Sequence, residues 1–160
     1  MPTASMRDIA TYYEEAGTGQ PLILIVPGSG PTDRDGNNPM GVTAAPYRLL
    51  AEALAAKGVG SLRIDKRGLF ASRQAVADPN AVTIADYGDD VAAWIAAARQ
   101  ATGRDCVWVL GHSEGGLVAA MLGASNADLD FVISMAGPGV NGYDVLILQN
   151  ELLLSAEGAT

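Results

Sequence analysis

A serine flanked by small residues lies where an apolar run gives way to a run of helix formers. Residues 107–110 read Val-Trp-Val-Leu, residues 111–116 read Gly-His-Ser-Glu-Gly-Gly, and an apolar, alanine-containing run follows. This order is typical of a strand, a tight turn and a helix, in which the turn lifts the hydroxyl of Ser113 out of the sheet. The small neighbours allow strand and helix to pack closely beneath it. The pattern therefore predicts a nucleophilic serine; the alternative is an ordinary strand-to-helix turn with an incidental serine.

The turn-rich loop at residues 27–38 allows two other interpretations, and its residues argue against both. The Gly-Ser-Gly at 28–30 could begin a dinucleotide-binding fingerprint, but Asp33 stands at the third glycine position. The Asp-x-Asp-x-Asn run at 33–37 could begin a calcium loop, but Ala44 stands where the closing glutamate is needed. We therefore expect no cofactor and no metal here, and a loop made rigid by its own Asp and Asn side chains.

Size and composition fit one globular domain and exclude several classes of protein. The chain has 160 residues, of which 49% are hydrophobic and 18% charged. The net charge of -8 argues against a nucleic-acid partner, because no basic surface is available to neutralise phosphates. The sequence contains no run of 18 apolar residues, which would predict a membrane span, and its N-terminus lacks the apolar core of a signal peptide. These features predict a cytoplasmic protein.

The elements needed to position Ser113 alternate along the chain. Strands are predicted at 9–14, 22–26, 60–64, 107–110 and 131–135, and helices from Pro46, from Thr83, after Ser113 and after residue 142. The run 22–26 is apolar at every position, which is typical of a parallel strand buried on both faces. The predicted fold class is α/β, a doubly wound, mostly parallel sheet with helices on both faces.

Three pieces of the sequence together resemble the α/β-hydrolase superfamily. They are the Gly-x-Ser-x-Gly turn at 111–115, the loop 27–30 after the first buried strand, and Asp-Lys-Arg-Gly at 65–68 after the next strand. More closely, residues 27–38, 62–68 and 135–139 together are similar to the N-terminal part of lid-bearing bacterial carboxylesterases. The resemblance extends over nearly the whole chain.

This resemblance implies roles for three residues. Ser113 would be the nucleophile. The backbone N–H of Glu114, the residue after it, would be one oxyanion donor, and the N–H of Ser29 would be the second. Removing one such donor typically lowers the rate by roughly a hundred- to a thousand-fold.

The sequence allows several partners for the charged side chains around the turn. Asp65 and Arg67 are expected to hold the loops above the sheet. The carboxylate of Glu114 could pair with Arg34, pair with Arg67, or face solvent, and the sequence leaves all three open.

The base and acid that a serine hydrolase needs are not recognisable in the sequence. In the resembling hydrolases an Asp or Glu and then a His follow the serine. The one histidine, His112, precedes Ser113 and is expected to point away from its hydroxyl as a packed structural residue. We therefore expect an α/β-hydrolase core that lacks its C-terminal strands, with residues 1–142 as the N-terminal part of the core and 143–160 as the start of a lid or connecting helix.

The predicted function is hydrolysis of a small-molecule carboxylic ester through an acyl-enzyme on Ser113, with base and acid outside these residues. Peptidase, thioesterase and lactonase activities use the same kind of site and remain open. The alternative is a non-catalytic α/β module that binds a small ligand or a partner chain. Because the strand at 131–135 is apolar on both faces, we also expect it to pair with a complementary C-terminal segment or with a second copy.

Overall fold

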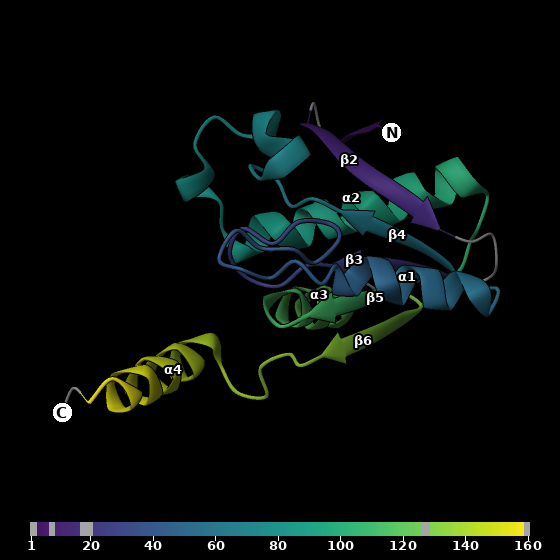
Figure 1. Cartoon of the computed structure of the whole chain (residues 1–160). Coiled ribbons are helices and arrows are strands. Elements are labelled where there is room, and N and C mark those ends of the chain that lie inside the picture. The colour runs from purple at the N-terminus through teal and green to yellow at the C-terminus, as the bar shows by residue number, and fades with distance from the viewer. Residues whose placement is uncertain (1–2, 7–8, 17–20, 126–128, 159–160) are drawn as a thin grey trace.

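Parallel strands form the centre of the structure, a computed structural model that describes residues 3–6, 9–16, 21–125 and 129–158. Its six-stranded sheet has the order β1-β2-β4-β3-β5-β6. The strands are β1 (Thr3–Met6), β2 (Ile9–Ala16), β3 (Leu22–Val26), β4 (Gly60–Ile64), β5 (Val107–His112) and β6 (Phe131–Met135). Strands β4, β3, β5 and β6 are parallel, whereas β1 and β2 pair antiparallel at one edge (Figure 1). The mostly parallel sheet predicted from the sequence is confirmed.

Four α-helices connect or follow these strands. They are α1 (Pro46–Ala56), α2 (Ile84–Thr102), α3 (Glu114–Ser125) and α4 (Gly142–Ala156). Thr83 caps α2 in a capping box with Asp86, as the Thr-x-x-Asp spacing indicates. Two short 3-10 helices, η1 (Phe70–Ala75) and η2 (Pro79–Ala81), lie between β4 and α2, where the sequence predicted neither helix nor strand.

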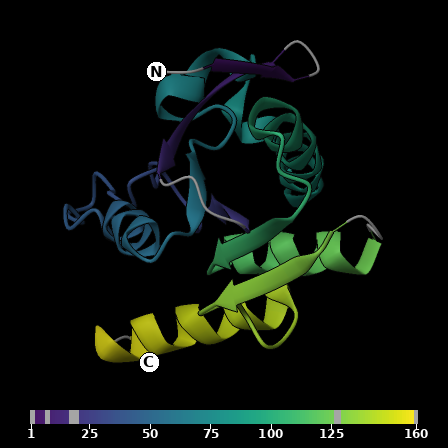
Figure 2. The same ribbon diagram turned by 90° about the vertical axis from the view of Figure 1, so that its right-hand side faces the viewer.

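Helices cover both faces of the sheet, and the two faces have separate cores. Helices α2 and α3 pack on one face against alternate residues of β3, such as Leu22 and Leu24. Helix α1 packs on the other face through Tyr47 and Ala51, against Ile23 and its neighbours. Figure 2 shows the blue α1 and the green α2 on opposite sides of the central strands. Strand β3 is therefore buried at every position, as its apolar run predicts.

The register of the parallel strands aligns their carboxyl ends along one end of the sheet. Val26 at the end of β3 pairs with Gly111 in β5, and His112 pairs with Met135 in β6. The loops after β3, β4 and β5 consequently meet above the carboxyl ends of the strands, where open α/β sheets have their binding and active sites.

The other border of the sheet, β6, and the helix after it expose much apolar surface. The Phe131 side chain is 54% exposed, and no residue of α4 is buried. The exposed apolar side chains of α4 are Tyr143, Leu146, Ile147, Leu148, Leu152, Leu153 and Leu154. In Figure 1, α4 extends away from the sheet. Among the described residues no helix is long and apolar enough to cross a membrane.

We expect the 160-residue chain to self-associate through β6 and α4. An uncharged edge strand offers backbone groups to another strand, and the leucine side chains of α4 gain by leaving water. Multi-angle light scattering on the purified chain should show dimers or larger species at micromolar concentration. Replacing Leu146, Leu152 and Leu153 by Glu should shift the distribution toward monomer. A wild-type chain that stays monomeric at high micromolar concentration would contradict this expectation.

Candidate active site

Ser113 sits in a strained turn between β5 and α3. Its φ angle is 52°, in the left-handed region, where a non-glycine residue costs on the order of 1–3 kcal/mol. The Ser113 N–H donates to the Met135 carbonyl at 2.9 Å, and the Ser113 carbonyl accepts from the Gly116 N–H at 2.9 Å. The end of β6 and the first turn of α3 thus hold the strained conformation in place.

The glycines around Ser113 are required by close backbone approach. A Cβ atom at Gly111 would lie 1.9 Å from the Gly115 carbonyl oxygen. A Cβ atom at Gly115 would lie 2.5 Å from the Val26 carbonyl oxygen at the end of β3. Both contacts are with backbone atoms, which no side-chain rotation can relieve. The sequence predicted this close packing of strand, turn and helix from the glycine spacing alone.

The loop after β3 lies directly against Ser113. A Cβ atom built on Gly28 would come within 3.3 Å of the Ser113 Cβ and 3.1 Å of the His112 Nδ1. The Gly28 N–H donates to the Tyr47 hydroxyl at 3.3 Å, and this hydroxyl lies 2.7 Å from the His112 Nδ1. The His112 side chain is therefore held by Tyr47 of α1, in agreement with the packed structural histidine expected from the sequence.

Tyr47 of α1 is a residue of this site that the sequence analysis did not single out. Burial raises the pKa of its hydroxyl, the Gly28 N–H opposes this shift, and the nearby Asp33 adds to it. The hydroxyl therefore keeps its proton at neutral pH, so it can both accept from Gly28 and bond to His112.

The carboxylate of Glu114 pairs with Lys66, which corrects the sequence-based options of Arg34, Arg67 or solvent. The Lys66 Nζ lies 2.9 Å from the Glu114 Oε1 and also donates to the Gly28 carbonyl at 2.7 Å. Lys66 is the second residue after β4, and its side chain is 4% exposed. The sequence analysis singled out its neighbours at this strand end and missed Lys66 itself.

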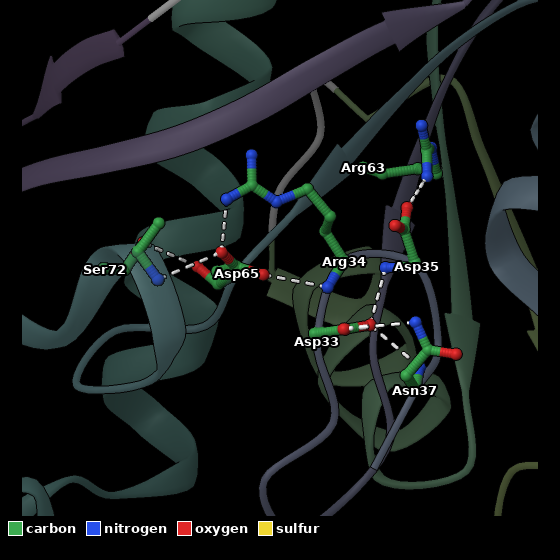
Figure 3. Close-up of polar contacts among 8 residues, drawn as sticks. Asp33, Arg34, Asp35, Asn37, Arg63, Asp65 and Ser72 are labelled. Atoms are coloured by element: carbon green, nitrogen blue, oxygen red, sulfur yellow. Dashed lines mark hydrogen bonds and ion pairs between the residues drawn. The ribbon is translucent and has the colours of Figure 1, made fainter. Parts of the chain in front are cut away.

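A second polar network fixes the loop after β3 (Figure 3). The Asp65 carboxylate accepts from the backbone N–H of Arg34 at 2.8 Å and also binds the Arg34 guanidinium. The Asp33 carboxylate accepts from the N–H groups of Asp35 and Asn37 at 2.9 and 2.8 Å, and Arg63 pairs with Asp35. The expectation of a loop made rigid by its own side chains is confirmed.

Arg67 holds the segment after β4 to α2. Its Nε donates to the Asp90 carboxylate at 2.6 Å, and its Nη1 lies 3.4 Å from that of Asp86. The hydrogen bond to Asp90 is the main cause of a raised pKa at Arg67. Asp65 and Arg67 therefore act as the loop supports that the sequence suggested.

Ser113 and the loop after β3 border a cavity of about 260 Å³. The residues lining it are Gly28, Ser29, Thr32, Gly36, Asn38, Val42, Pro46, Tyr47, His112, Ser113 and Met135. Within the described parts of the chain, the N–H groups of Ser29 and Glu114 donate no hydrogen bond, so both remain available to an anion in this region. The same parts contain no group of His, Cys, Asp or Glu side chains suited to hold a metal ion.

Comparisons with known proteins agree with this architecture. A model of the family described as serine aminopeptidase, S33, matches residues 40–153. Among solved structures, the chain is similar to an epoxide hydrolase from Vigna radiata, with 21% identity and a TM-score of 0.69. It is also similar to an α/β hydrolase from Novosphingobium aromaticivorans (23%, TM-score 0.67) and to an esterase from Exiguobacterium antarcticum (18%, TM-score 0.64). No curated protein matches the sequence.

The three alignments cover most of this chain but less than half of each solved chain. They cover 89%, 93% and 86% of this chain and 40%, 48% and 45% of the three others, in the order given. At these identities the likeness shows the fold, which is that of the α/β-hydrolases.

Proposed function

Because this chain belongs to the serine aminopeptidase S33 family of α/β-hydrolases, we propose that it carries the nucleophile of a serine hydrolase that cleaves carboxylic esters. The observation that supports this most is the position of Ser113. It lies in a left-handed turn at the start of α3, beside the cavity and against the Gly28 loop. A role in binding alone would not need a serine in a strained turn.

The proposed reaction begins with attack of the Ser113 Oγ on the ester carbonyl carbon. A base accepts the hydroxyl proton as the Oγ–C bond forms, and the carbonyl oxygen becomes an oxyanion. The N–H groups of Ser29 and Glu114 are the proposed donors to this oxygen. Collapse of the intermediate expels the alcohol, which takes up the proton, and a water molecule then releases the acid by the same steps.

We propose that the base and the acid that orients it come from outside these 160 residues. The only histidine in the sequence is His112, and its Nδ1 bonds to Tyr47. Within the described residues, the bonds that hold the turn use the backbone N–H and carbonyl of Ser113, which leaves its hydroxyl to the proposed base. The proposed base would reach this hydroxyl from the cavity side.

An ester is favoured over a peptide with a free amino terminus by the cavity's charge. An aminopeptidase needs an acceptor, usually a carboxylate, for the substrate's ammonium group. The described lining of the cavity contains no Asp or Glu side chain. A neutral ester therefore fits this part of the site better than an ammonium-bearing substrate.

The decisive experiment uses the full-length polypeptide, which here means the 160 residues together with the segment proposed to supply the base and the acid. It is labelled covalently with a fluorophosphonate and analysed by peptide mass spectrometry. We expect one phosphonyl group, attached to the peptide that contains Ser113. Denatured protein serves as the control, because labelling must depend on the folded site. An adduct on another residue, or none under conditions where esters are hydrolysed, would contradict the proposal.

The 160-residue chain alone should hydrolyse p-nitrophenyl acetate only weakly. Without its base, a serine hydrolase retains residual catalysis from substrate binding and the oxyanion site. In a well-studied case this leaves a rate about 10³–10⁴ times that of the uncatalysed reaction in water. Initial rates at pH 7 should therefore lie orders of magnitude below those of the full-length polypeptide. A fast rate that disappears in Ser113→Ala would reveal a base within this chain.

A non-catalytic module that binds a small ligand or a partner chain is the second candidate. The absence of any histidine other than His112 from these 160 residues favours this candidate. The probe experiment separates the two candidates, because a module without an activated serine would not be labelled in the full-length polypeptide.

A further inference from the structure

The peptide groups of Gly28 are held from two sides by side chains that also engage the neighbours of Ser113. On one side the Gly28 N–H donates to the Tyr47 hydroxyl, which lies against His112. On the other side the Gly28 carbonyl accepts from the Lys66 ammonium, which also binds Glu114. The residues before and after Ser113 are thus each tied to Gly28 through one intermediate side chain.

The Lys66 ammonium is buried, and it contacts three groups of the surrounding structure. It donates to the Gly28 carbonyl at 2.7 Å and to the Glu114 carboxylate at 2.9 Å. It also lies 4.9 Å from the centre of the Tyr87 ring, within cation–π range. A buried ammonium needs such partners, since losing water is otherwise costly. The lysine is therefore fixed in one position.

The bond to the Gly28 carbonyl also fixes the Ser29 N–H. Both groups belong to one planar trans peptide unit and point in opposite directions. A cation on the carbonyl oxygen sets the plane of this unit and polarises its N–H, which strengthens it as a donor. The second contact of Lys66 is with the side chain of Glu114, whose backbone N–H begins α3.

We propose that Lys66 is a positioning residue that sets both oxyanion donors, the Ser29 N–H through the Gly28 carbonyl and the Glu114 N–H through the Glu114 carboxylate. This inference rests on the proposed function, because it assumes that these N–H groups face the reacting oxygen. A salt bridge with a purely structural role would require the contact with Glu114 but not the one with the Gly28 carbonyl.

The test compares Lys66→Met with Lys57→Met in the full-length polypeptide. Met keeps an unbranched stem and removes the charge, and Lys57, the other lysine of the chain, is an exposed residue after α1. Because the donors are displaced rather than deleted, Lys66→Met should lower kcat for an oxoester by about ten- to a hundred-fold with little change in KM. Lys57→Met should leave both constants unchanged.

A thionoester distinguishes positioning of the donors from general damage. Its sulfur is a weak hydrogen-bond acceptor, so its hydrolysis gains little from the two N–H groups. Lys66→Met should therefore lower the oxoester rate more than the thionoester rate. Equal losses on both substrates, or no loss on either, would overturn the proposal.

If Lys66→Met fails to fold, Glu114→Ala provides the second variant, since its side chain is 25% exposed. Loss of its carboxylate should lower the oxoester-to-thionoester rate ratio by about threefold or more, because the donors are set less firmly. An unchanged ratio would overturn the proposal.

The proposed function can fail separately from the positioning role. Absence of probe labelling at Ser113 would refute the function. In that case the ¹⁵N–¹H amide signal of Ser29 still reports on the contact between Lys66 and the Gly28 carbonyl. The signal should shift in Lys66→Met and stay unchanged in Lys57→Met. If Lys66→Met does not fold, Glu114→Ala takes its place. No shift of this signal would refute the positioning role.

Discussion

Gly111→Ala is expected to prevent the polypeptide from folding to a stable native state. The added Cβ would lie 1.9 Å from the Gly115 carbonyl oxygen and 2.2 Å from the carbonyl carbon. To relieve this contact, β5 and α3 would have to separate, which would open the core between them. We expect the free energy of unfolding to fall by at least about 4–5 kcal/mol, a loss seen only for the most disruptive substitutions. This is a large part of the roughly 5–15 kcal/mol that stabilises a typical domain.

Gly88→Ala is the matched control for this substitution. Gly88 lies inside α2, and a Cβ atom there would have no atom within 4 Å. Alanine should therefore raise the free energy of unfolding by roughly 0.5–1 kcal/mol, the usual gain in a helix interior. Urea denaturation of the full-length polypeptide followed by circular dichroism measures both changes. The Gly111→Ala protein should lack the native circular-dichroism signal and the cooperative urea transition, and a variant as stable as wild type would contradict the close packing of β5 and α3.

Ser113→Ala should abolish ester hydrolysis by the full-length polypeptide while leaving the fold intact. Loss of the nucleophile lowers kcat by about a million-fold in a serine hydrolase where it has been measured. Alanine occupies less space than serine, and the bonds that hold the turn involve only the backbone of residue 113. The thermal midpoint should therefore change little.

Steady-state kinetics with a p-nitrophenyl ester measures this loss, and Ser125→Ala serves as its control. Ser125 is an exposed serine at the last turn of α3. It should retain the wild-type rate. If Ser113→Ala kept more than about a hundredth of the wild-type kcat, a different nucleophile would be required.

The fold could be predicted from the sequence because its parallel strands carry unambiguous local signals. The apolar run of β3 and the glycines around β5 indicate buried strands and close approach, and the start of α2 follows from its capping box. The strand β1 and the helices η1 and η2 were missed. Their sequences, Thr-Ala-Ser-Met, Phe-Ala-Ser-Arg-Gln-Ala and Pro-Asn-Ala, contain no run of apolar residues like that of β3, so no hydrophobic pattern marks them.

The polar partners within the site were harder to predict than the nucleophile. A lysine and a glutamate 48 residues apart in the chain meet only because β4 and β5 both flank β3. Tyr47 fits the apolar stripe of α1, and nothing in the spacing indicates that its hydroxyl reaches Gly28. Local patterns reveal which residues are buried, whereas the pairing of buried charges depends on the order of strands in the sheet.

The loop between β3 and α1 has two parts that would respond differently to mutation. Residues 33–37 are fixed by the Asp33 carboxylate and by the pair of Arg34 with Asp65. Residues 38–42 instead form a turn closed by their own hydrogen bond, from the Asn38 N–H to the Val42 carbonyl at 2.8 Å. The side chains of Met40 and Val42 are 80% and 47% exposed, and Val42 borders the cavity. Substrate preference could therefore diversify at the tip of this loop, in nature or in a directed-evolution library, without disturbing the geometry around Ser113.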